Sequence, residues 1–90
     1  MQEVYGVAAF RSRQQVLRFE ALLRRNGVPV RVVSTQRDIS MGCGLSVRFQ
    51  MEDAPAVQRA LLTDNPGNLI GLYRAEYDGA KLRVSPIPSR

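Results

Sequence analysis

The pattern of apolar runs and of alternating apolar and polar residues predicts four strands. The nearly continuous apolar run at residues 4–10 is typical of a central strand that is covered on both faces. In residues 28–34 valines alternate with other residues, and Pro29 predicts an edge position because proline cannot donate to a strand ladder. Residues 45–49 alternate apolar and polar side chains, which predicts one buried and one polar face. Residues 69–77 form the fourth strand-like run.

Two segments with a helical period lie between these strands. Residues 13–26 follow Ser12, a good N-cap residue, and precede Gly27, which tolerates the left-handed conformation that ends a helix. The second helix is predicted to follow Asp53 as its N-cap, with Pro55 in its first turn. The buried stripes are predicted to consist of Val16, Phe19, Leu22 and Leu23 in the first helix and of Val57, Ala60 and Leu61 in the second.

The order strand, helix, strand, strand, helix, strand predicts an α+β fold. It is the order of the ferredoxin-like split βαββαβ arrangement, in which both helices cover one face of an antiparallel sheet. The pair Asp78-Gly79 predicts a two-residue hairpin turn, after which residues 80–84 fold back as a short fifth strand. Two prolines follow, so residues 1–84 are predicted to form a single domain and residues 85–90 a mobile tail.

Composition narrows the class of protein further. A chain of 90 residues with 44% apolar content is large enough for one core and too small for a second domain. The net charge of +5 favours anionic partners, which include nucleic acid, phosphate or carboxylate ligands and acidic protein surfaces. There is no apolar run of membrane-spanning length and no signal-peptide pattern, so we expect a cytoplasmic protein without a membrane partner.

Histidine is absent and cysteine occurs once, which limits the available chemistry. Without an imidazole, the chain lacks the Ser-His-Asp and Cys-His pairings of hydrolases. A single cysteine forms no disulfide within the chain and is too few for a structural zinc site or an iron–sulfur cluster. We therefore expect no metal and no cofactor.

The single cysteine lies in a long connection between two predicted strands. Residues 36–44 read Q-R-D-I-S-M-G-C-G, which is longer than a hairpin turn requires. Gly42 and Gly44 flank Cys43, leave its sulfur unshielded and allow backbone N–H groups to turn toward an anion. Together with Arg37 they favour the thiolate, which is the nucleophilic form. The alternative is that Cys43 is a small buried apolar residue without a role.

The same loop carries a resemblance to a known family. The residues concerned are Arg37, Ile39, Ser40, Cys43 and Gly44. With the helix that ends at Gly27, they make the chain similar to the small bacterial selenium/sulfur carrier-like family. The resemblance implies a carrier that is not itself an enzyme, with Cys43 as the carrier thiol and Arg37, Ser40 and the two glycine amides around it. It also implies a donor protein, such as a cysteine desulfurase, and an acceptor protein.

Two other functions are compatible with the residues. Tyr5, Arg31 and Arg48 are predicted to lie on the sheet face without helices, where RNA-recognition domains place stacking aromatic residues. The chain would then be an RNA- or anion-binding module with an incidental cysteine, although the aromatic signature of that module is absent. A small regulatory domain that forms a homodimer through its sheet or its edge strand is the other alternative.

Overall fold

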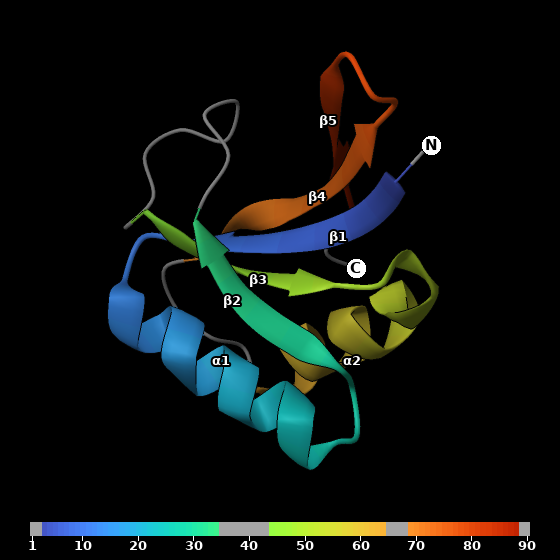
Figure 1. Ribbon diagram of the computed structural model, residues 1–90. Helices are drawn as coiled ribbons and strands as arrows, with labels where there is room; N and C mark the ends of the chain where they lie inside the picture. Colours follow the sequence, from blue (N-terminus) through green and yellow to red (C-terminus); the bar gives the residue numbers. More distant parts are fainter. Residues whose placement is uncertain (1–2, 35–43, 65–68, 89–90) are drawn as a thin grey trace.

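The structure is a computed structural model that describes residues 3–34, 44–64 and 69–88 (Figure 1). Its elements in chain order are β1 (Glu3–Phe10), α1 (Arg13–Arg25), β2 (Val30–Ser34), β3 (Leu45–Phe49), the single-turn helix η1 (Met51–Asp53), α2 (Ala54–Asp64), β4 (Leu69–Tyr77) and β5 (Leu82–Ile87). The predicted α+β class and the four strands and two helices of the core are confirmed.

The strands form one antiparallel sheet in the order β2-β3-β1-β4-β5. The apolar strand β1 is central, and β2, which follows Pro29, lies at an edge, as predicted. Arg24 of α1 donates a hydrogen bond to the Val30 carbonyl at 3.0 Å and so ties the start of the edge strand to the helix. The strand that carries Arg31 is therefore held from two sides, by β3 and by α1.

Helix α1 forms because its apolar residues recur on one face. Val16, Phe19 and Leu23 are buried, and the ring of Phe19 packs against Phe10 of β1 with 5.3 Å between ring centroids. Gly27 follows the helix with φ of +79°, the left-handed conformation that its position predicts. Ser12 occupies the N-cap position, but its side chain makes no capping hydrogen bond.

Both helices cover the same face of the sheet, as predicted (Figure 1). The strands and helices contribute to one cluster of buried side chains on that face. Its members from the sheet are Ala8, Phe10, Val30, Val47, Phe49 and Leu72, and those from the helices are Val16, Phe19, Leu23, Ala54, Val57, Ala60 and Leu61. The predicted stripes are therefore correct, except that Leu22 is only partly buried.

The opposite face of the sheet, called the open face below, has its own buried cluster. Tyr5, Val7, Ala9 and Ala75 are buried there, with partly buried Ile70, Tyr73, Leu82 and Val84 against them. Ser46 lies on this face in register with Ala9 and is fully buried. The prediction of a polar, solvent-facing side for β3 is therefore wrong at Ser46. That prediction assumed that a sheet face without helices is exposed to solvent, whereas Ser46 is buried on it.

The final hairpin differs from the prediction. Tyr77 pairs with Leu82, so the turn contains four residues rather than two. The Asp78 carboxylate accepts hydrogen bonds from the backbone N–H groups of Lys81 at 2.9 Å and Ala80 at 3.2 Å, and Gly79 has φ of +93°. Side-chain capping of a turn by aspartate is local chemistry that lengthens the loop beyond the pair Asp78-Gly79.

The last strand also extends further than predicted. It runs to Ile87 instead of ending at Val84, and Ile87 packs against the helix-side cluster. Pro86 is tolerated because β5 is an edge strand, where a missing N–H breaks no ladder in the middle of the sheet. The Gln58 side chain of α2 donates to the Pro88 carbonyl at 2.6 Å. Residues 85–87, which the sequence placed after the last strand, thus belong to the sheet.

The turn makes stability depend on pH. The N–H groups of Lys81 and Ala80 lower the pKa of Asp78 below its ordinary value of 3.8. A carboxylate whose folded-state pKa is lowered stabilises the fold above its unfolded-state pKa, and this stabilisation disappears as the pH falls through the folded-state value. We expect Asp78→Asn to be less stable than the wild type at neutral pH and the difference to shrink below pH 3.8. Urea unfolding of both proteins between neutral and acidic pH measures the difference in their free energies of unfolding. A difference that stays constant with pH would contradict a stabilising role of the Asp78 carboxylate.

Candidate functional site

The described part of the predicted loop site is its last residue. Gly44 is exposed, has φ of +88° and immediately precedes β3. Arg37, Ser40, Gly42 and Cys43 lie outside the described residues. The connection begins and ends at one place in the fold, because Ser34 at the end of β2 pairs with Leu45 at the start of β3. The predicted position of the loop between two neighbouring antiparallel strands is therefore confirmed, and its chemistry stays a prediction.

A second group of candidate side chains lies on the open face of β1, β2 and β3. Arg31 of β2 is in direct register with Arg48 of β3, and Arg48 is in register with Val7 of β1. Tyr5 lies two residues from Val7 on the same face of β1. The prediction that Tyr5, Arg31 and Arg48 share the face without helices is confirmed, and we refer to these three residues as the open-face cluster.

Arg48 is the best-positioned member of the open-face cluster. Its guanidinium lies over the Tyr5 ring, 3.9 Å from the ring centroid, and it donates a hydrogen bond to the Glu3 carboxylate. A guanidinium stacked on an aromatic face gains cation–π stabilisation and is limited to a narrow range of orientations. Arg48 is thus directed along β1, toward Tyr5 and Glu3.

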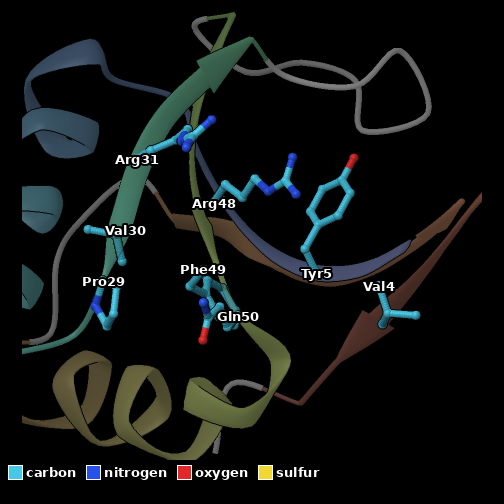
Figure 2. A pocket seen from close by; sticks show the side chains of 8 residues that line it. All are labelled: Val4, Tyr5, Pro29, Val30, Arg31, Arg48, Phe49 and Gln50. Atoms are coloured by element: carbon cyan, nitrogen blue, oxygen red, sulfur yellow. The ribbon is translucent and has the colours of Figure 1, made fainter. Parts of the chain in front are cut away.

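An open depression lies beside these side chains. It has a volume of about 270 Å³ and is lined by Val4, Tyr5, Pro29, Val30, Arg31, Arg48, Phe49 and Gln50. Figure 2 shows Arg31, Arg48 and Tyr5 extending to the same side of the strands. Pro29 and Gln50 lie at the other end of the depression. The walls therefore combine two cationic side chains with an aromatic ring that one of them covers.

The sequence did not predict that Glu3 joins the open-face cluster through Arg48. Its position two residues before Tyr5 places it on the same face of β1, which is a signal that strand alternation provides. Its pairing with Arg48 depends on the register between β1 and β3, however, and register is not visible in the apolar pattern. The side chain of Glu3 is 51% exposed, so this ion pair lies at the surface.

Tyr5 does not present the surface that base stacking requires. Its exposed fraction is 9%, and the Arg48 guanidinium covers one face of its ring. Base-binding sheets offer accessible aromatic faces on which nucleotides stack. The geometry of the open-face cluster is better suited to binding an anionic group than a base.

The described residues give no sign of a metal centre. Within residues 3–34, 44–64 and 69–88, no three or more His, Cys, Asp or Glu side chains come together as a group that could hold a metal ion. No helix in these ranges combines the length and the apolar character of a membrane span.

The fold and the connection at Gly44 define a small α+β protein that carries a glycine-flanked cysteine between two strands. Residues 5–74 match the family described as Putative Se/S carrier protein-like, and the matched range includes both strands that bound the loop. The chain belongs to this family. No curated protein and no solved structure is similar enough to be matched to it.

Proposed function

We propose that this protein is a carrier, not itself an enzyme, that holds one sulfur or selenium atom on Cys43. The observation that carries the proposal is the family match over residues 5–74, which contains the only cysteine of the chain. A carrier of this kind needs one accessible nucleophile and no acid–base partner of its own, which suits a chain without histidine.

The residues around the thiol have complementary roles in this proposal. Arg37 and the backbone N–H groups of Gly42 and Gly44 stabilise the thiolate and the anionic product, and Ser40 belongs to the same loop. The exposed, left-handed Gly44 supports this arrangement, because a residue with a side chain is strained at φ of +88°. The backbone beside Cys43 is therefore free of side-chain atoms on at least one side.

The loading step is a chalcogen exchange. The Cys43 thiolate attacks the outer atom of a persulfide or selenopersulfide on a donor cysteine, and a bond forms between the Cys43 sulfur and that atom. The bond to the donor sulfur breaks, and the donor sulfur leaves with the electron pair as a thiolate. No external oxidant or reductant enters the step, and delivery to an acceptor is the same exchange in the opposite sense.

The partners follow from this chemistry. A cysteine desulfurase is a suitable donor because it presents the atom as a protein persulfide, and the acceptor is a second protein with a nucleophile. The net charge of +5 favours partners with an acidic docking surface. We place the exchange in the cytoplasm, where the reducing conditions keep a single thiol free.

We also infer that the core belongs to the ferredoxin-like arrangement, with β5 added at one edge. Each of α1 and α2 connects two parallel strands that have a third strand between them: β3 lies between β1 and β2, and β1 lies between β3 and β4. This is the split βαβ unit used twice. In this arrangement β2 ends and β3 begins at the same end of the sheet, where Ser34 pairs with Leu45.

Intact-mass spectrometry tests the carrier proposal. After incubation with a cysteine desulfurase and cysteine or selenocysteine, we expect the wild type to gain one sulfur or selenium atom that thiol reductants remove. Cys43→Ala should gain none. Arg37→Gln should load more slowly, whereas Arg25→Gln, which removes the same charge at the end of α1, should load at the wild-type rate. Loading that persists in Cys43→Ala would sink the proposal.

A further inference from the structure

We propose that the open face carries a binding site for a small phosphate-bearing ligand, held by Arg31 and Arg48, in which the Glu3 carboxylate occupies the anion position when the ligand is absent. This site goes beyond the carrier function and does not involve Cys43. It rests on the register of three strands, one ion pair and one depression in the surface.

The first observation is the pairing of two like charges. Arg31 and Arg48 are direct cross-strand partners, and like charges in that position destabilise a sheet. Arg48 has Glu3 as a counter-ion, whereas exposed Arg31 forms no ion pair within the described ranges. An anion bound between the two guanidinium groups would supply the missing negative charge.

The second observation is that Arg48 is already held in place. Stacking on Tyr5 restrains its guanidinium plane, and the ion pair with Glu3 shows that its N–H donors are directed at an oxyanion position. A planar guanidinium binds phosphate through two parallel hydrogen bonds, and a restrained one loses less conformational entropy on binding. Arg48 thus binds one side of the phosphate with a guanidinium that is already oriented, and Arg31 on the neighbouring strand binds the other side.

The third observation concerns Glu3, whose carboxylate competes for the same donors. It is half exposed at the start of β1, so moving it away from Arg48 costs little. A phosphate dianion carries more charge than one carboxylate and can bind both arginines at once. The resident carboxylate therefore lowers the apparent affinity for the ligand without closing the site.

The size and surroundings of the site indicate a small ligand rather than a nucleic acid. The depression of about 270 Å³ is close to the lower limit for small-molecule pockets, and Tyr5 is too covered to stack a base. A phosphate group with a compact organic substituent matches this volume. A polynucleotide would need a longer basic groove and accessible aromatic faces.

Titration with inorganic phosphate at low ionic strength, followed in ¹H–¹⁵N NMR spectra, tests the proposal. We expect saturable shifts at Tyr5, Arg31 and Arg48. Arg31→Ala should weaken binding by at least about fivefold, and Arg48→Lys, which keeps the charge but loses the planar fork, should weaken it as well. Glu3→Gln should strengthen binding by about two- to fivefold, since it removes the competing carboxylate.

The control variant is Arg18→Ala, which removes an exposed arginine from α1 on the other side of the sheet and should leave the affinity unchanged. An equal loss in Arg18→Ala and Arg31→Ala, or no saturable shifts on the open face, would overturn the proposal. So would binding of a short single-stranded RNA at Tyr5 without competition by phosphate. Cys43→Ser should bind phosphate normally, so failure of the carrier function and failure of this site give different results.

Discussion

Replacing Leu23 by alanine is expected to lower the free energy of unfolding by about 2–5 kcal/mol. Leu23 is fully buried in the last turns of α1 and belongs to the cluster between the helices and the sheet. The change removes apolar contacts and leaves a cavity that tightly packed neighbours fill only in part. For a domain whose total stability is of the order of 5–15 kcal/mol, this is a large fraction.

The matched control for Leu23 is Leu17, which lies on the same helix with a side chain that is 47% exposed. Leu17→Ala is expected to change the free energy of unfolding by no more than about 0.5 kcal/mol, because shortening an exposed side chain leaves no cavity in the core. Urea unfolding followed by circular dichroism compares the two variants under the same conditions. Similar losses in both would show that the helix does not bury the face we assign to it.

Gly6→Ala is the second variant with a large expected effect. A Cβ atom built at Gly6 would lie 2.2 Å from the Phe49 ring, which is itself buried in the helix-side cluster. The ring cannot move without displacing its own neighbours, so we expect a loss of about 1–3 kcal/mol, and a larger one for Gly6→Val. Glycine at this position allows the Phe49 ring to lie directly against the central strand.

A double-mutant cycle separates this close approach from other effects of the alanine. Phe49→Leu vacates part of the space that the ring occupies, so Gly6→Ala should cost less in that background than in the wild type. Gly71→Ala is a useful comparison, since the nearest neighbours of its Cβ would be atoms of the Tyr73 side chain, at 3.2 Å or more. Additive losses at Gly6 and Phe49 would contradict a steric origin.

Local patterns were sufficient to predict most of the secondary structure. The period of Val16, Phe19 and Leu23 identified α1, and Gly27 marked its end, because helix burial and helix termination depend on a few neighbouring residues. The final hairpin was harder to predict, since the Asp78 side chain caps the turn and shifts the pairing to Tyr77 and Leu82. The edge position of β5 then allowed Pro86 to remain within a strand.

The two candidate sites also differ in how far the sequence predicts them, because one lies in a single segment and the other joins distant segments. Glycines beside Cys43 are visible in the sequence, and the structure bounds their loop by the pairing of Ser34 with Leu45. The contact of Arg48 with Glu3 joins residues 45 positions apart and depends on how β3 aligns with β1. No single-segment pattern specifies such an alignment, so the sequence predicts the shared face of the open-face cluster but not its contact with Glu3.

The central position of β1 has a consequence for how the chain acquires its structure. Glu3 pairs with Tyr77, so the second neighbour of the first strand is among the last elements to be synthesised. Contacts between distant parts of a chain slow folding, because the intervening segment must be ordered before they form. We therefore expect the emerging polypeptide to keep one side of β1 unpaired until β4 is complete, which makes a chain interrupted before residue 69 the form most prone to aggregate.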